Sequence, residues 1–171
     1  LNTVTSWVAT DFESASRMTD PGGGLARTGD LVASFGTKSV EFFYNAGDAV
    51  GSVLQRTPNA ILGIGANASS TTGRPVLLSD TAGIVCWIGN ASDVKFRSVY
   101  MLDGGRAKPI STPAIDAIIS ETTSTLYSIS AFDAWGHKVI HISKGTAINL
   151  LYFVDLGIWM EANFPGPMIF A

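Results

Sequence analysis

Short apolar runs, each closed by turn residues, recur along the chain after its first thirty residues. Runs of this length, alternating or continuous in their apolar positions, predict β-strands. The Asp-Pro-Gly-Gly-Gly segment at residues 20–24 interrupts any regular element, so residues 1–30 are predicted as loop. The predicted strands are 31–35, 40–44, 53–56, 60–64, 76–79, 84–88, 98–102, 106–110, 127–133, 138–142, 149–154 and 158–161.

Local signals place one hairpin and one helix among these strands. Asp103 and Gly104 form an Asp-Gly pair, which favours a tight hairpin between two of the predicted strands. Residues 112–120 are predicted as the helix, because Thr112 suits the N-cap and Pro113 suits the first turn. Polar loops are predicted at residues 67–74 and 89–97.

The strands group into three blade-like units at about residues 25–65, 76–111 and 126–162. Four short antiparallel strands form one blade of a β-propeller or half of a sandwich, and a spacing of about 40–50 residues is typical of repeats. The predicted fold class is therefore mainly β and propeller-like, with one short helix. Because propellers close with about four to eight blades, residues 1–171 are predicted to be a single partial propeller domain, completed by further residues or held by neighbours. Both chain ends look cut.

Composition excludes several classes of protein. Charged residues make up 15% of the 171 residues, and Gly, Ser and Thr take the place of Lys and Glu. With a mean hydropathy of +0.28, this profile argues against disorder. A net charge of −3 argues against a basic groove that grips nucleic acid, although it is compatible with a conduit along which DNA slides. The longest apolar run, residues 150–154, is far below the roughly 20 residues of a membrane span. No signal peptide is visible.

Candidate chemistry is sparse. His137 and His141 would share one face of a strand, but no third metal ligand is evident beyond nearby Asp133, so turn and strand-surface positions are predicted for both. Cys86 lies in an apolar run and is predicted to be a core residue. Glu41 interrupts an apolar strand, which suggests that it faces away from Phe42 or pairs with a basic group at an interface.

No catalytic, cofactor-binding or metal-binding residue is predicted, and the chain is not expected to be an enzyme. No nucleophile elbow or phosphate loop is present. Paired carboxylates of a glycosidase remain an alternative, with candidates Asp93, Asp103, Asp116, Glu121, Asp133 and Glu161. The large aromatic residues are predicted to be blade cores and interface anchors; they are Phe42, Phe43, Tyr44, Trp87, Trp135 and Trp159.

Several segments, in order along the chain, resemble the packaged-DNA stabilisation proteins of short-tailed phages (podoviruses), also called tail-hub or nozzle proteins. The first is Val40–Asp48, Val-Glu-Phe-Phe-Tyr-Asn-Ala-Gly-Asp, which is similar to a characteristic stretch of that family. The other matching segments are 11–15, 20–21, 61–65, 85–89, 98–100, 110–116, 136–137 and 154–161. The likeness thus extends over most of the sequence.

This resemblance implies a structural part of the virion, assembled in the host bacterial cytoplasm. It implies a homo-oligomeric ring, a hexamer, below the portal or head-to-tail adaptor ring and above tail needle or fibre proteins. Such a ring would extend the DNA channel, retain packaged DNA until ejection and let genomic DNA pass without sequence-specific binding. The alternative hypothesis is a sugar-binding or glycoside-active propeller of a virion or secreted protein.

Overall fold

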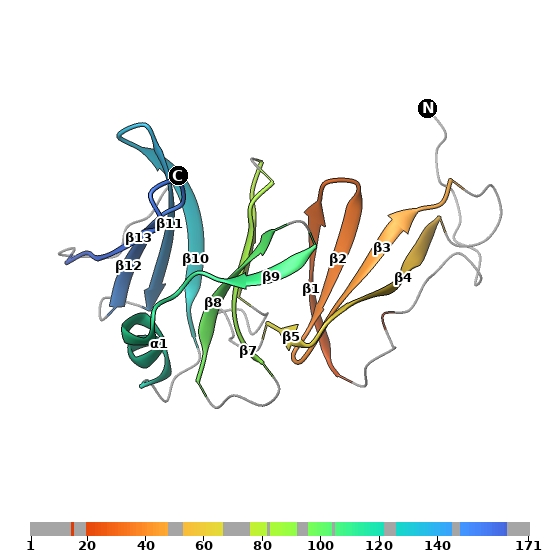
Figure 1. Ribbon diagram of the computed structural model, residues 1–171, viewed down its shortest axis with the longest axis horizontal. Helices are drawn as coiled ribbons and strands as arrows, with labels where there is room; N and C mark the ends of the chain where they lie inside the picture. The colour runs from red at the N-terminus through yellow and green to blue at the C-terminus, as the bar shows by residue number, and fades with distance from the viewer. Residues whose placement is uncertain are drawn as a thin grey trace.

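A computed structural model of the chain describes Ala15 and residues 20–47, 53–66, 76–81, 83–91, 96–103, 105–121, 126–144 and 148–163. Three antiparallel sheets stand side by side along the long axis, with the N-terminal sheet at one end and the C-terminal sheet at the other (Figure 1). One short helix lies beside the C-terminal sheet (Figure 1). The prediction of a mainly β fold with four-stranded antiparallel sheets and a short helix is confirmed, and the middle sheet has a fifth strand.

The N-terminal sheet has the order β1-β2-β3-β4. Its strands are β1 (Gly22–Thr28), β2 (Leu31–Gly36), β3 (Val40–Asn45) and β4 (Leu54–Leu62). The prediction of loop over residues 22–28 was wrong. Glycines are poor strand formers alone, but here β1 pairs with β2 from Gly22↔Gly36 to Thr28↔Leu31, and the two-residue turn Gly29-Asp30 closes the hairpin, with Gly29 at φ +58°.

The prediction of two separate strands at residues 53–56 and 60–64 was wrong. The predicted strands 53–56 and 60–64 form one continuous strand, and only Ile64 and Gly65 separate from it as β5 (Ile64–Gly65). A register shift opposite Glu41 and Phe43 absorbs the polar residues between the two apolar runs. β5 then pairs with the middle sheet, at Ile64↔Ala91 and Gly65↔Asn90. The N-terminal sheet therefore runs from Gly22 to Leu62, whereas the predicted unit ran from 25 to 65.

The middle sheet is built on β7 (Val85–Ala91) and β8 (Ser98–Asp103), with β9 (Arg106–Pro109) at its outer edge. Both β5 and the short β6 (Leu77–Ser79) pair with the other side of β7. The predicted hairpin at Asp103 is confirmed by the pairing Asp103↔Arg106. The predicted loop 89–97 is shorter than expected, because β7 continues to Ala91; the predicted loop 67–74 lies outside the described residues.

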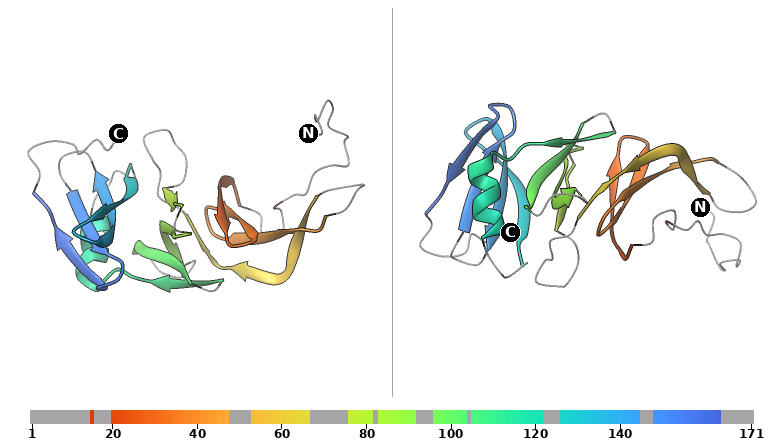
Figure 2. Two further views of the ribbon diagram at one scale, coloured as in Figure 1. Left: turned by 90° about the horizontal axis from the view of Figure 1, so that it is seen from above. Right: turned by 60° about the horizontal axis from the view of Figure 1, so that its bottom comes forward.

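The helix α1 (Pro113–Ser120) begins as predicted, because the Thr112 hydroxyl caps it by accepting a hydrogen bond from the Ile115 amide. The C-terminal sheet follows with the order β10-β11-β12-β13. Its strands are β10 (Ser128–Ala134), β11 (His137–Lys144), β12 (Ile148–Phe153) and β13 (Ile158–Glu161). Figure 2 shows the same succession of three sheets from two other sides.

The side chains of β7 point alternately into two cores, and these cores join the three sheets. Val85 and Trp87 point into a core shared with Phe35 of the N-terminal sheet, whereas Cys86 and Ile88 point into a second core. That second core contains Ile115 and Ile119 of α1 and the β11–β12 residues Ile140, Ile142 and Leu150. Since successive side chains of a strand point to opposite faces, the continuous apolar run of β7 belongs to a sheet covered on both sides.

Polar contacts also cross between the sheets. The Trp159 indole donates to the Ile110 carbonyl at 2.7 Å, and Lys138 Nζ lies 3.8 Å from an Asp80 carboxylate oxygen. The Ser79 hydroxyl donates to the Arg27 carbonyl at 3.4 Å. These contacts fix neighbouring sheets against one another where the apolar cores end.

Candidate interaction surfaces

The turn between β10 and β11 presents an aromatic side chain to solvent. Trp135 is 82% exposed, and it stacks on Phe153 with ring centroids 6.5 Å apart. Its φ of +52° is an unfavourable backbone conformation for a bulky residue. The predicted role as an interface anchor therefore remains a prediction for Trp135, whereas Trp87 is a fully buried core residue.

Apolar side chains continue from Trp135 onto the outer face of the C-terminal sheet, the face turned away from the middle sheet. Val139, Leu151 and Phe153 form a small buried cluster there. Ile158 and Met160 pair across the strands with Phe153 and Leu151, and both are 49% exposed. This face is thus apolar from the turn to the outer strand, with its edge still open to solvent.

An imidazole–carboxylate pair lies at the same end of the sheet. His137 Nδ1 hydrogen-bonds to an Asp155 carboxylate oxygen, and its ring meets the edge of Phe153. The hydrogen bond from His137 lowers the pKa of Asp155 below its ordinary value. The pair ties the β10–β11 turn to the β12–β13 turn.

His141 corrects the prediction of a surface position for both histidines. It shares a face with His137, as predicted, but it is buried, and its Nε2 lies 3.2 Å from Asn149 Oδ1. Among the described residues, no group of three or more His, Cys, Asp or Glu side chains could hold a metal ion. The two histidines therefore have separate polar partners rather than common ligand geometry.

Glu41 faces away from Phe42, as one of the two sequence hypotheses held, and it is only 3% exposed. Its carboxylate pairs with Arg56 Nε at 2.9 Å, and the same guanidinium lies over the Phe43 ring, 5.9 Å from its centroid. Sequence reasoning did not identify Arg56 as the partner, because the register of β3 and β4 brings the two together. The outer face of the N-terminal sheet thus carries a paired charge.

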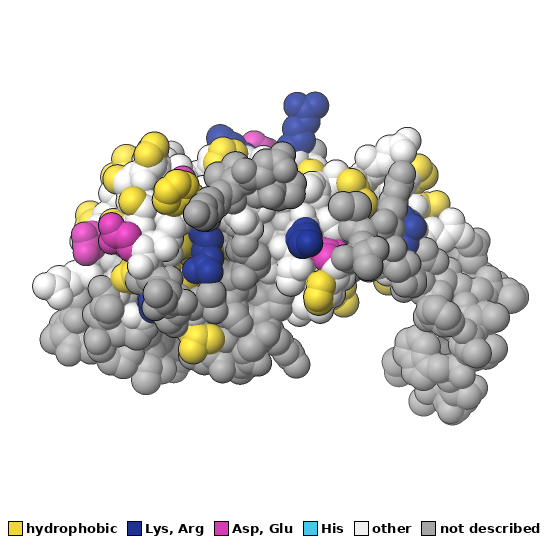
Figure 3. Space-filling view, turned by 90° about the horizontal axis from the view of Figure 1, so that it is seen from below, with side chains coloured by type: hydrophobic (Ala, Val, Ile, Leu, Met, Phe, Trp, Pro, Cys, Tyr) yellow, Lys and Arg dark blue, Asp and Glu magenta, His cyan; other side chains and the backbone are white. Residues whose placement is uncertain are grey.

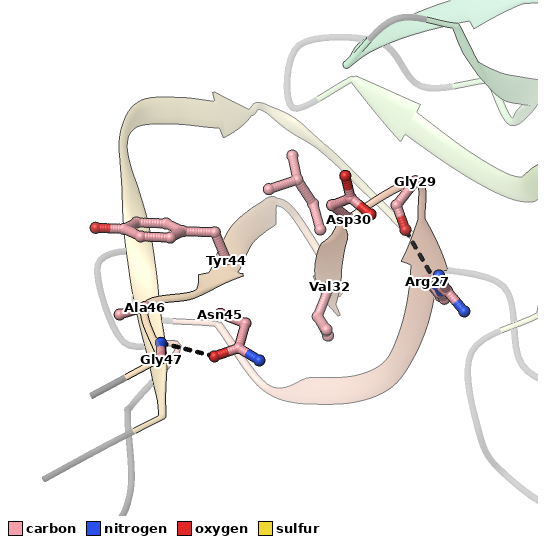
Figure 4. Close-up of a pocket in the computed structure, with 9 residues that line it drawn as sticks. Arg27, Gly29, Asp30, Val32, Tyr44, Asn45, Ala46 and Gly47 are labelled. Atoms are coloured by element: carbon pink, nitrogen blue, oxygen red, sulfur yellow. Dashed lines mark hydrogen bonds between the residues drawn. The ribbon is translucent and has the colours of Figure 1, made fainter. Parts of the chain in front are cut away.

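A hollow of about 580 Å³ lies at the turn end of the N-terminal sheet. Figure 4 shows Tyr44, Asn45 and Gly47 along one side and Arg27 and Gly29 along the other. Arg27 Nε donates to the Gly29 carbonyl at 3.0 Å, which holds the guanidinium at the rim. The hollow combines apolar walls, an aromatic ring and one charge of each sign, from Arg27 and Asp30.

Five of the six carboxylates considered for a glycosidase lie within the described residues, on β8, β10 and β13 and on or next to α1. Asp116 lies on α1 and accepts from the Ser98 hydroxyl, Asp133 pairs with Lys138, and Glu161 ends β13. Asp103 lies in the β8–β9 hairpin, Glu121 is the helix C-cap, and Asp93 lies outside the described residues. Cys86 is fully buried, and burial raises the pKa of its thiol.

Charge is scattered over one face of the molecule. On the face drawn in Figure 3, the visible Lys and Arg side chains lie apart from one another, interspersed with apolar and acidic side chains. A groove that grips nucleic acid would gather them. No helix in the described part of the chain has the length and apolar character needed to cross a membrane.

Comparison with known proteins identifies the family of the chain. A family model described as bacteriophage P22 Gp10, β-propeller, matches residues 1–146. The chain belongs to this family. Its members are phage DNA-stabilisation proteins with a structural role, in agreement with the resemblance of Val40–Asp48 and the later segments, and the family supports a podovirus tail protein located in the virion. No curated relative matches the chain.

Proposed function

We propose that the protein is a subunit of a ring in the tail hub of a short-tailed phage. In this role the ring extends the DNA channel below the portal and adaptor and retains packaged DNA until ejection. The observation that carries the proposal is the family match over residues 1–146, joined to three sheets that pack face to face through shared cores. The role is geometric and needs no reactive centre.

The three sheets belong, in this proposal, to one propeller domain that further blades complete. Stacked antiparallel sheets are the repeating unit of a propeller, and β7 is already covered on both sides as an internal blade would be. Six subunits form the ring, the adaptor lies above it, and needle or fibre proteins lie below it. Assembly takes place in the host cytoplasm before the particle is released.

Low net charge supports passage of DNA without tight binding. The chain carries 11 basic and 14 acidic residues, so it neutralises few phosphates and releases few counterions on contact. A wall of this kind resists neither entry nor exit of the duplex. Retention of DNA then depends on closure of the channel by the assembled tail and not on affinity for phosphate.

The test is a phage with a stop codon in this gene, grown with and without a complementing copy. We expect filled heads without complementation to lack the hub in electron micrographs and to lose their DNA, which becomes sensitive to nuclease. Heads that keep their DNA and carry complete tails would overturn the proposal. A glycan array with the purified full-length protein covers the alternative, since saturable binding or hydrolysis of a saccharide would favour the sugar-active propeller.

A further inference from the structure

The three sheets follow one another in chain order, from the N-terminal sheet through the middle sheet to the C-terminal sheet (Figure 2). Each sheet is built around two central strands that lie between its edge strands. These are β2 and β3, β7 and β8, and β11 and β12. The same cross-strand position can therefore be compared in all three sheets.

One apolar pair lies on the face that each sheet turns toward the C-terminal end of the row. Each pair joins the two central strands directly across the sheet, and no member is more than 5% exposed. The pairs are Phe35↔Val40, Ile88↔Val99 and Val139↔Phe153. The three faces therefore share their strand position and their apolar character.

In the first two sheets this face is covered by the sheet that comes next in the chain. Phe35 meets Trp87 of the middle sheet, with ring centroids 5.1 Å apart. Ile88 shares a core with Ile140 of the C-terminal sheet. In the third sheet, the described residues of the apolar cluster around Val139 all belong to the sheet itself or to the residue that directly follows it. Within the described chain, the third face therefore lacks the sheet that covers the other two.

We propose that a fourth antiparallel sheet of the same polypeptide covers the outer face of the C-terminal sheet, and that residues after Ala162 form it. The inference rests on the propeller domain proposed above, and it specifies the face at which the next sheet packs and the chain that supplies it. At both sheet-to-sheet contacts of the described chain, the cover comes from the sheet that follows in sequence. The occupant is therefore the next segment of this chain and not a second copy.

The outer strand of the C-terminal sheet leaves apolar surface for this contact. Ile158 and Met160 lie on the outer face, because they pair with Phe153 and Leu151, and each is 49% exposed. Trp135 bounds the same face at the turn end, where it stacks on Phe153. Neighbouring exposed apolar side chains of this kind mark an interaction surface. A sheet laid against the face would remove Ile158 and Met160 from water, which is favourable.

The polar groups of this face already have partners within the C-terminal sheet. Those groups form the pairs His141–Asn149 and His137–Asp155. Lys138, which pairs with Asp133, points to the opposite face from Val139 and lies 3.8 Å from Asp80 of the middle sheet. The complement of the outer face is therefore an apolar sheet and not a charged surface.

The sequence after β13 agrees with a further sheet. The turn residues Pro165, Gly166 and Pro167 are followed by the apolar run Met168-Ile169-Phe170. An apolar run after a turn signal predicts a strand. These residues lie outside the described part of the chain, and the proposal assigns them to the start of the fourth sheet.

A photocrosslinking probe on the outer strand identifies what covers the face. The full-length protein carries p-benzoylphenylalanine in place of Met160, and a second variant carries it in place of Ile158, so that the test remains possible if one variant fails to fold. The matched control carries the probe in place of Phe96, which is 59% exposed in the connection before β8. Circular dichroism identifies the folded variants. After irradiation, denaturing electrophoresis separates crosslinks within one chain, at the monomer mass, from crosslinks between chains, at the dimer mass.

We expect the probes on β13 to give crosslinks in the monomer band. Mass spectrometry should join each probe to residues after 162, with at least one site beyond residue 171, and the control probe should give none of these crosslinks. A crosslink from either β13 probe in the dimer band assigns the face to a second copy and overturns the proposal. A folded variant without crosslinks to residues after 162 overturns it too, and the same crosslinks from the control probe count against a specific contact.

These outcomes are separate from the test of the tail-hub role. A dimer band or an uncovered face leaves that role intact, because the phage with the stop codon tests DNA retention independently. Conversely, heads that keep their DNA without this protein overturn the tail-hub role, and monomer-band crosslinks from β13 still support the fourth sheet.

Discussion

The middle sheet and the C-terminal sheet both contain strongly apolar strands. Within the described residues, other sheets cover both faces of the middle sheet but only one face of the C-terminal sheet. β7 alternates between two cores, with Trp87 on one side and Ile88 on the other. β12 is buried at all six of its residues. On the outer face of the sheet, however, Phe153 packs only against Phe132 of β10 and Trp135 of the β10–β11 turn, which belong to the same sheet.

An unbroken apolar strand therefore indicates two covered faces without indicating what covers them. For β7 the cover is a neighbouring sheet on each side. For the outer face of β12 the cover is partial, and Ile158 and Met160 beside it remain half exposed. The C-terminal sheet is therefore suited to a partner, and the middle sheet is suited to the interior of the domain.

The largest expected effect comes from exchanging tryptophan for alanine in the two sheets. Trp87 is fully buried and contacts Phe35 and Tyr100, at centroid distances of 5.1 and 5.8 Å. We expect Trp87→Ala to lower the free energy of unfolding by about 3–5 kcal/mol. Trp135→Ala, which loses only an exposed stack on Phe153, should cost about 0.5–1.5 kcal/mol. Equal losses in urea denaturation would contradict the assignment of one residue to the core and the other to the surface.

A smaller effect is expected where β5 approaches β7. A Cβ atom on Gly89 would lie 2.0 Å from the Gly65 carbonyl oxygen, and backbone cannot yield to it cheaply. Gly89→Ala should therefore cost about 1–3 kcal/mol through overpacking. Gly63→Ala is the matched control, because a Cβ there meets nothing within 4 Å. Equal unfolding midpoints for the two variants would refute the close approach of the strands.

Much of this fold follows from local pattern. The hairpin at Asp103, the Thr112 cap and most strands could be predicted, because turn chemistry and alternating apolar positions act within a few residues. β1 could not be predicted from Gly22–Gly24, since its pairing with β2 outweighs glycine's weak strand preference. The two-residue turn Gly29-Asp30 was the signal that would have revealed it.

The candidate surfaces were harder to predict than the strands. Glu41 was conspicuous in sequence, but its partner Arg56 depends on the register shift between β3 and β4. The hollow is lined by residues at the ends of β1, β2 and β3, which only the pairing of these strands brings together. Trp135 could be identified as an aromatic anchor, yet only the structure shows its exposure and positive φ.

The outer face of the N-terminal sheet carries the ion pair of Glu41 and Arg56, and its contribution to stability can be tested by substitution. Glu41→Gln removes the negative charge beside the partly buried Arg56, and we expect a loss of about 1–3 kcal/mol in the free energy of unfolding. A double-mutant cycle with Arg56→Gln isolates the pair. If the two single losses add without coupling, the ion pair contributes nothing and the charged outer face needs another explanation.

The smallest effect concerns the turn end of the C-terminal sheet and depends on pH. His137 holds the pKa of Asp155 below its ordinary value, so the folded protein favours the ionised carboxylate. The sign follows from linkage: this contribution to stability is fully present above the ordinary pKa of an aspartate and is lost as pH falls through the depressed pKa. Unfolding midpoints of wild type and Asp155→Asn should therefore differ at neutral pH and converge in acid. Titration of the Asp155 carboxyl by NMR gives the direct measurement, and an ordinary pKa there would show that the two turns are not tied by this hydrogen bond in solution.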